Sequence, residues 1–206
     1  MSNTVLIWDL DGTLLDSYGV IVSSLRDTLA EFRVTPDPAD ILRQVKDGSV
    51  SAFLKQTAAE TGLSLPQLRQ RYSEISGSRV LDIPTMPHTP EILSDTAAAG
   101  AAHFVYTHRG TTTAPVLENL NLAHYFQEVI TSLNGFPRKP SPDALLYLIE
   151  RHRLDKSRVF YVGDRTLDVE CAQNAGVRSI LYSPSGPGAA DYVVRDLMEI
   201  QPIALT

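Results

Sequence analysis

Compact blocks of apolar residues alternate with longer amphipathic runs along most of the chain. Each block is rich in Val, Ile, Tyr or Phe, which is typical of strands buried in a parallel sheet. We predict strands at residues 5–8, 103–107, 158–163, 178–182 and 191–194.

Helices are predicted between these blocks. Residues 89–100 end in a glycine at a C-cap position, and residues 113–122 carry apolar residues at helical spacing. Residues 141–152 open with Ser141 as the N-cap and Pro142 at the first helical position. This alternation of strands and helices indicates an α/β fold with a doubly wound, Rossmann-like parallel sheet.

The segment from residue 16 to residue 82 contains no strand-like block. Its apolar residues recur every three or four positions, as on one face of a helix. Helical windows lie at residues 17–32, 37–46, 50–62 and 64–75. We therefore predict an α-helical domain over residues 16–82, inserted into an α/β core made of residues 1–15 and 83–206.

Composition narrows the classes of function. The 206 residues are 43% hydrophobic, enough for one domain or two small ones. A net charge of -6 argues against a nucleic-acid or anionic-membrane binder, which would normally show a basic face. No apolar run reaches the length of a transmembrane helix.

The expected setting is the cytoplasm. Asp9 and Asp11 interrupt the only early apolar run, which argues against a signal peptide, and the single cysteine, Cys171, fits a reducing compartment. The five histidines are scattered, so a histidine zinc site is not expected. We expect a monomer or a weak homodimer, because no long exposed apolar stripe is evident.

Two aspartates one residue apart follow the first predicted strand. Side chains at positions i and i+2 of an extended segment point to the same side, so Asp9 and Asp11 would lie together. Their repulsion requires relief by a cation or by a shared proton. The alternative is a polar turn at a strand end, since Asp and Gly are common turn residues.

Two further polar residues suggest an anion site. Thr107 ends a predicted strand, with its hydroxyl near a helix N-terminus, where anions bind. Lys139 lies among three prolines that stiffen its loop, and a lysine supplies a compact positive charge for a phosphate oxygen. An N-cap threonine and a solvated lysine are the alternatives.

An acidic pair follows a later strand. Gly163 permits the turn after the strand, and we predict Asp164 and Asp168 on one face of the following helix. Like charges at that spacing destabilise a helix, and a cation such as Mg²⁺, which prefers carboxylate oxygens, would offset the penalty. The alternative is a helix first turn in which the dipole favours acidic residues.

These stretches together resemble a known family. DLDGT at 9–13, Thr107, Lys139-Pro140 and GDxxxD at 163–168 resemble, in order, the four motifs of the haloacid-dehalogenase-like hydrolase superfamily. The inserted helical segment looks like the small α-helical cap of its phosphoglycolate-phosphatase-like and β-phosphoglucomutase-like members. The resemblance covers nearly the whole chain.

The resemblance implies a role for each motif residue. Asp9 would be the nucleophile that forms an aspartyl-phosphate, and Asp11 would be the general acid and base. Mg²⁺ would be held by Asp9, the main-chain carbonyl of Asp11 and Asp164, with Asp168 bound directly or through water. The Thr107 hydroxyl and Lys139 would hold the phosphoryl oxygens.

The implied reaction is Mg²⁺-dependent hydrolysis of a small phosphorylated metabolite. Dehalogenases of this fold lack the second aspartate, so Asp11 argues for phosphate chemistry. A phosphomutase of the β-phosphoglucomutase type and a non-catalytic phospho-ligand sensor remain alternatives.

Substrate contacts are expected chiefly from the cap, because loops and lids over a rigid sheet usually select the substrate. Lys46 and Gly48 are the candidates there. In the core, His108 and Arg109 are candidates, with exposed loop residues as the alternative. His88 stands where similar proteins have glycine, and Arg165 stands where threonine is frequent.

Overall fold

The computed structural model describes residues 4–183 and 189–205. The chain divides into two compact units. Residues 1–16 and 84–206 form one of them, called here the core unit, and residues 17–83 form the other, the helical unit.

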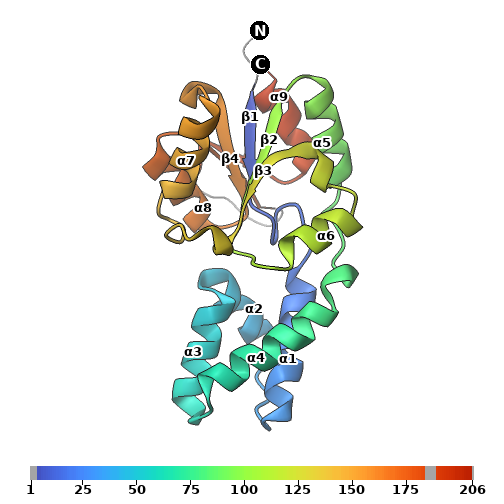
Figure 1. Cartoon of the computed structure of the whole chain (residues 1–206), viewed down its shortest axis with the longest axis vertical. Helices are drawn as coiled ribbons and strands as arrows, with labels where there is room; N and C mark the ends of the chain where they lie inside the picture. Colours follow the sequence, from blue (N-terminus) through green and yellow to red (C-terminus); the bar gives the residue numbers. More distant parts are fainter. Residues whose placement is uncertain (1–3, 184–188, 206) are drawn as a thin grey trace. The chain divides into compact units, whose positions relative to one another are not determined.

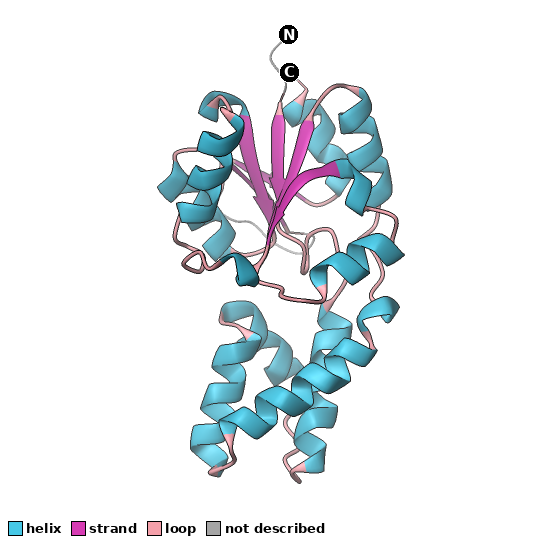
Figure 2. Ribbon diagram, viewed as in Figure 1, coloured by secondary structure: helices cyan, strands magenta, loops and turns pink. Residues whose placement is uncertain are grey.

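The core unit is built on a parallel sheet, drawn in magenta in Figure 2. The sheet has six strands in the order β3-β2-β1-β4-β5-β6. The strands are β1 (Val5–Trp8), β2 (Ala102–Tyr106), β3 (Phe126–Ile130), β4 (Val159–Gly163), β5 (Arg178–Tyr182) and β6 (Tyr192–Val194). In the register of the central strands, Trp8 lies beside Val105 and Val162. The segments that follow β1, β2 and β4 therefore leave the sheet at the same edge.

Helices cover both faces of this sheet. Figure 1 shows α7 and α8 on one side and α5 and α9 on the other, so the predicted doubly wound sheet is confirmed. The helices of the core unit are α5 (Thr89–Ala98), α6 (Thr113–Asn119), α7 (Asp143–His152), α8 (Thr166–Ala175) and α9 (Ile200–Ala204). One buried cluster joins strands to α7 and α8 through Ile7, Phe104, Tyr161, Leu145, Leu148, Cys171 and Ala172.

The edge strand β3 was not predicted from the sequence. Its five residues, FQEVI, include Gln127 and Glu128, and only Ile130 is fully buried. A strand at the edge of a sheet is covered less completely than a central strand, so it need not form a continuous apolar block.

Two helix starts in the core unit differ from simple expectation. Pro142 rather than Ser141 is the N-cap of α7, and the Ser141 hydroxyl donates to the Asp143 carboxylate instead of capping the backbone. His88, the N-cap of α5, has φ 62°. Glycine adopts that left-handed conformation most easily, which is a physical reason for similar proteins to have glycine at the position of His88.

The helical unit has a hydrophobic core of its own. Its helices are α1 (Tyr18–Glu31), α2 (Pro38–Asp47), α3 (Val50–Thr61) and α4 (Leu65–Ser78). The core is formed by Ile21, Leu25, Leu29, Ile41, Val45, Phe53, Leu54 and Leu68. Asp37 and Ser49 cap α2 and α3 by accepting backbone N–H groups at 2.7 and 3.1 Å. Across the described residues, no helix has both the length and the apolar character needed to span a membrane.

Candidate active site

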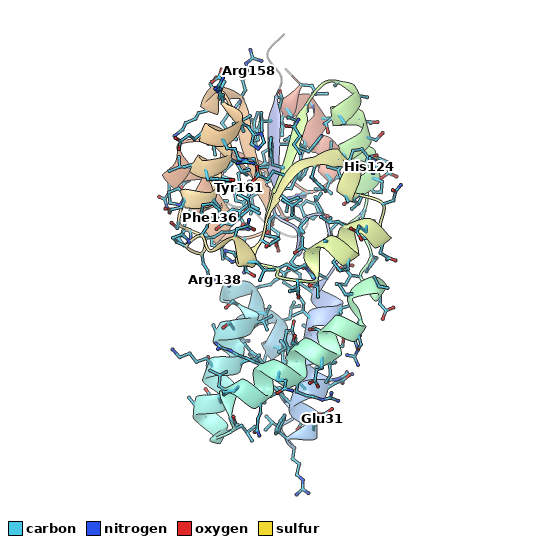
Figure 3. All side chains as sticks on the ribbon, in the orientation of Figure 1. Glu31, His124, Phe136, Arg138, Arg158 and Tyr161 are labelled. Carbon is cyan, nitrogen blue, oxygen red and sulfur yellow. The ribbon has the colours of Figure 1, made fainter. Side chains whose placement is uncertain are left out.

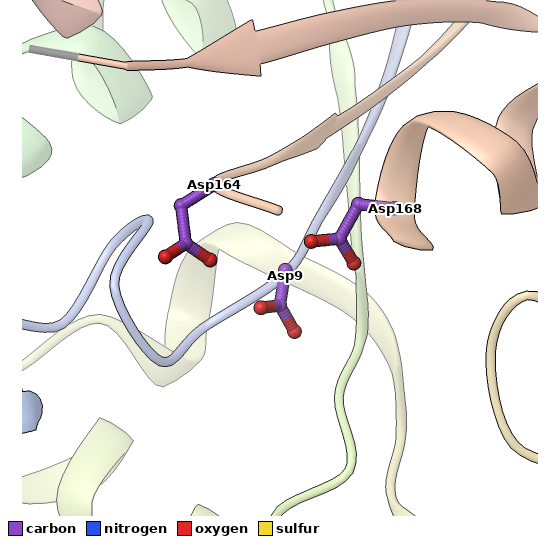
Figure 4. Close-up of side chains that lie close together, drawn as sticks. All are labelled: Asp9, Asp164 and Asp168. Atoms are coloured by element: carbon purple, nitrogen blue, oxygen red, sulfur yellow. The ribbon is translucent and has the colours of Figure 1, made fainter. Parts of the chain in front are cut away.

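Three carboxylates gather at the edge of the sheet where β1 and β4 end. Asp9 follows β1, Asp164 follows β4, and Asp168 lies in the first turn of α8 (Figure 4). One oxygen from each lies within 4.8 Å of the others, and Asp9 and Asp168 are buried. The N–H of Asp9 donates to the carbonyl of Val162 at 2.8 Å, which continues the sheet pairing and fixes the backbone there.

The donor set fits a divalent cation. Carboxylate oxygens are the preferred ligands of Mg²⁺, and two oxygens on opposite sides of an octahedral Mg²⁺ lie about 4.2 Å apart. In the cluster, the three ligand oxygens are separated from one another by at most 4.8 Å. The three side chains could therefore bind such an ion with little rearrangement.

Lys139 neutralises part of this charge. Its side chain is fully buried, and its Nζ donates to Asp9 Oδ1 at 2.7 Å and to Asp168 Oδ1 at 2.8 Å. Burial alone would lower the pKa of Lys139, but the two carboxylates outweigh it and raise the pKa above its ordinary value. Burial raises the pKa of Asp9 to about 6, against the opposing effect of Lys139. Lys139 therefore stays charged, and Asp9 is largely ionised at neutral pH.

The prediction that Asp164 and Asp168 share one face of a helix is wrong. The helix α8 begins at Thr166, because Arg165 is extended, with φ -126° and ψ 155°. Asp164 lies in the loop before it. The Asp168 carboxylate turns back toward that loop, where its Oδ2 accepts the N–H of Arg165 at 3.1 Å.

The role of Gly163 also differs from the predicted turn. This glycine is the last residue of β4. A Cβ at this position would lie 2.4 Å from the Cβ and Cγ of Asp168. Glycine is required there because the Asp168 side chain approaches the backbone closely.

Arg109 pairs with Asp11. Its Nε donates to Asp11 Oδ1 at 3.2 Å, its Nη2 donates to the same oxygen, and its Nη1 donates to Thr112 Oγ1 at 3.2 Å. The Arg109 side chain is only 10% exposed, so the alternative of an exposed loop residue is wrong. The sequence offered no signal for this pair, because the two residues are 98 positions apart.

Thr107 is buried directly after β2. Its N–H donates to the carbonyl of Ile130, and its hydroxyl accepts the N–H of Arg109 at 3.1 Å. The helix α6 has Thr112 as its N-cap, so the alternative reading of Thr107 as an N-cap is wrong.

His108 lies between two residues of the loop that carries Lys139. The N–H of Lys139 donates to His108 Nε2 at 3.0 Å, and Arg138 Nη2 lies 2.9 Å from His108 Nδ1. Burial, with the charges of Lys139, Arg138 and Arg165, lowers the pKa of His108 to about 2. The imidazole is therefore neutral at physiological pH.

Lys46 and Gly48 lie in the helical unit, at the end of α2 and just beyond it. Lys46 Nζ lies 4.5 Å from the centre of the Tyr18 ring, and the N–H of Gly48 donates to the carbonyl of Gln44 at 3.0 Å. A Cβ at Gly48 would lie 3.1 Å from that same oxygen. Their contact with a substrate stays a prediction.

Comparison with known proteins gives consistent matches. A family model described as haloacid dehalogenase-like hydrolase matches residues 6–182. The phosphoglycolate phosphatase of Agrobacterium fabrum is 32% identical over 181 residues, which cover 84% of this chain and 78% of the relative. The phosphoglycolate phosphatase of Caulobacter vibrioides is 28% identical over 219 residues, covering 100% and 92%. The solved structure of a hydrolase from Streptococcus pneumoniae TIGR4 has a TM-score of 0.67 and 29% identity, covering 98% of each chain.

Proposed function

The chain belongs to the haloacid dehalogenase-like hydrolases and is a phosphatase, and we propose that it hydrolyses a small phosphomonoester such as phosphoglycolate through an aspartyl-phosphate. The observation that carries the proposal is the buried Asp9, held by Lys139 beside two further carboxylates. The relatives from Agrobacterium fabrum and Caulobacter vibrioides support phosphoglycolate as the first substrate to test.

Asp9 and Asp11 divide the chemistry between them. A carboxylate oxygen of Asp9 forms a bond to phosphorus while the bond from phosphorus to the ester oxygen breaks, and Asp11 donates a proton to the leaving oxygen. Asp11 then takes a proton from water, which attacks phosphorus and releases inorganic phosphate from Asp9. Arg109 would anchor the Asp11 carboxylate during this exchange.

The other residues manage charge and position. Lys139, hydrogen-bonded to Asp9 Oδ1, keeps the nucleophile ionised and supplies positive charge beside the phosphoryl group, whose oxygens the Thr107 hydroxyl would also bind. Mg²⁺ held by Asp9, Asp164, Asp168 and the main-chain carbonyl of Asp11 would offset the charge of the phosphoryl group.

We also propose that the helical unit serves as the cap that selects the substrate. Lys46 and Gly48 would contact the substrate from that unit, and His108 would contact it from the core unit. A monomer or weak homodimer in the cytoplasm stays the expected state, to be checked by light scattering and cell fractionation.

The test is phosphate release from a panel of phosphorylated metabolites, with Mg²⁺ and with chelator. Asp9→Asn should lower turnover by about a thousandfold or more, because the nucleophile is lost. Asp95→Asn, an exposed aspartate on α5, is the matched control and should retain wild-type turnover.

Two results would overturn the proposal. The first is turnover that survives in Asp9→Asn, which would place the activity elsewhere. The second is a wild-type protein that releases no phosphate from any compound but converts a sugar phosphate when a bisphosphate primer is added, as a phosphomutase would.

A further inference from the structure

The imidazole of His108 faces two donors. The backbone N–H of Lys139 lies 3.0 Å from Nε2, and Arg138 Nη2 lies 2.9 Å from Nδ1. A neutral imidazole accepts at one nitrogen only and donates at the other. Because a backbone N–H can only donate, Nε2 is the acceptor and Nδ1 carries the proton. The Nδ1–H then faces a guanidinium, which has no acceptor atom. Both facing groups are therefore donors, and neither accepts a hydrogen bond from the other.

Protonation of the ring does not supply the missing acceptor. A charged imidazolium would add a positive charge beside Arg138 and would still have two N–H donors. Burial and the neighbouring cations hold the pKa of His108 at about 2, so the ring stays neutral. An oxyanion between Nδ1 and the guanidinium would accept from both groups.

Arg138 also differs from the other cations of this site. Lys139 pairs with Asp9 and Asp168, and Arg109 pairs with Asp11. Among the residues that the structure describes, no carboxylate forms an ion pair with Arg138, which lies on the loop before Lys139 with its side chain only partly covered (Figure 3). Its pKa is lowered by burial and by the nearby Arg165, which means that positive charge gathers here.

The position of the pair suggests what it binds. His108 directly follows Thr107 and Arg138 directly precedes Lys139, and those two neighbours are the residues proposed to hold the phosphoryl group. We propose that Arg138 and the Nδ1–H of His108 bind a second oxyanion on the substrate, so that the preferred substrates are phosphomonoesters that also carry a carboxylate or a second phosphate. A guanidinium suits this role because its planar fork matches both oxyanions with paired hydrogen bonds.

This inference rests on the proposed function only in taking the phosphoryl group to lie at Asp9, so its first test is binding without turnover. Calorimetry with Mg²⁺ present would compare phosphonoacetate and methylenediphosphonate with methylphosphonate, which lacks the second oxyanion. We expect at least one of the first two to bind about tenfold or more tightly than methylphosphonate, the size of a charge-assisted hydrogen bond. Their order tells whether a carboxylate or a second phosphate is bound. Equal affinities for all three would overturn the proposal.

Variants then assign the preference to Arg138. In Arg138→Gln the affinity advantage over methylphosphonate should fall by about tenfold, and Arg138→Lys should retain part of it. Arg195→Gln removes an exposed arginine of the core unit that forms no ion pair among the described residues, and it should keep the full advantage. An undiminished advantage in Arg138→Gln would overturn the assignment.

Turnover separates this proposal from the proposed function. The ratio of kcat/KM for phosphoglycolate to that for p-nitrophenyl phosphate should fall in Arg138→Gln by a factor similar to the loss in binding. Wild-type protein that binds phosphonoacetate selectively but hydrolyses no phosphoester would contradict the proposed function and still support the oxyanion subsite. Hydrolysis with a kcat/KM ratio that Arg138→Gln does not change would support the proposed function and contradict the oxyanion subsite at Arg138.

Discussion

The side chain of Asp168 lies so close to Gly163 that a methyl group on Gly163 would sit 2.4 Å from two Asp168 carbon atoms. Gly163 cannot easily move away, because it ends β4 and pairs with Leu181 of β5. Asp168 Oδ1 accepts from Lys139 Nζ at 2.8 Å, and that same Nζ donates to Asp9. A displacement of Asp168 would therefore reach the proposed nucleophile.

Gly163→Ala should lower kcat/KM by about a hundredfold, because a shift of about 1 Å in an active-site group has that effect. Overpacking should also reduce the free energy of unfolding by about 1–3 kcal/mol. Gly77→Ala is the matched control, since a Cβ there would meet no atom within 4 Å, and as a helical position of α4 it should gain about 0.5–1 kcal/mol. Steady-state kinetics measures kcat/KM, and urea denaturation measures the free energy of unfolding, for both variants. Wild-type kcat/KM in Gly163→Ala would show that Asp168 can move without effect.

Lys139→Met should destabilise the fold at pH 7 by about 3 kcal/mol or more, because it leaves the buried carboxylates of Asp9 and Asp168 without their cation. Mg²⁺ should restore more stability in this variant than in the wild type, since the same oxygens can bind the metal. Urea denaturation with and without Mg²⁺ measures the difference. The exposed Lys55→Met serves as control and should behave as wild type. A loss of stability that Mg²⁺ does not reduce would argue against metal binding by these carboxylates.

Arg109→Gln should lower kcat by about tenfold, because Asp11 loses the guanidinium that anchors it. This is less than the full effect of a positioned acid–base group, because Asp11, the proposed acid and base, is still present. If Arg109 acts through Asp11, it should have little further effect once Asp11 is changed to Asn. A double-mutant cycle on kcat tests this coupling. Additive losses would mean that Arg109 acts independently of Asp11.

His103 should make the stability of the fold depend on pH. It is buried, its Nδ1 accepts the indole N–H of Trp8 at 3.0 Å, and its Nε2 lies 3.2 Å from Thr96 Oγ1. Burial lowers the pKa of His103 from 6.5 to about 4. Between pH 6.5 and pH 4 the unfolded chain binds more protons at this histidine than the folded chain does. The neutral His103 therefore contributes about 3 kcal/mol to the free energy of unfolding, which is fully present above pH 6.5 and is lost as the pH falls through 4.

Asp9 acts in the opposite direction over nearly the same range. Its folded pKa is raised to about 6, so its protonation favours the fold as the pH falls from 6 toward 3.8. The measurement is therefore the difference in unfolding free energy between wild type and His103→Gln, followed from pH 7 to pH 4 by the fluorescence of Trp8, the single tryptophan. The advantage of the wild type should shrink with acidity. Parallel curves would contradict the lowered pKa of His103.

The elements that were predictable share a physical cause. The central strands β1, β4 and β5 are covered on both faces, so their sequences are continuous apolar blocks, and the helices of the helical unit carry an apolar face at helical spacing. The motif residues could be named because each follows a strand end at a definite position in the chain. The edge strand β3, which is less covered, has no such block and was missed.

The sequence by itself determined the class of fold, the helical insertion and the identity of the acidic and basic residues at the sheet edge. Only the tertiary structure decided how they pair. Lys139 bonds to Asp9 across 130 positions and Arg109 to Asp11 across 98. Arg138 lies 2.9 Å from the His108 ring, 30 positions away. Such pairs depend on the order and register of the parallel strands, which bring distant loops to one edge. No local pattern of hydrophobic and polar residues encodes that arrangement.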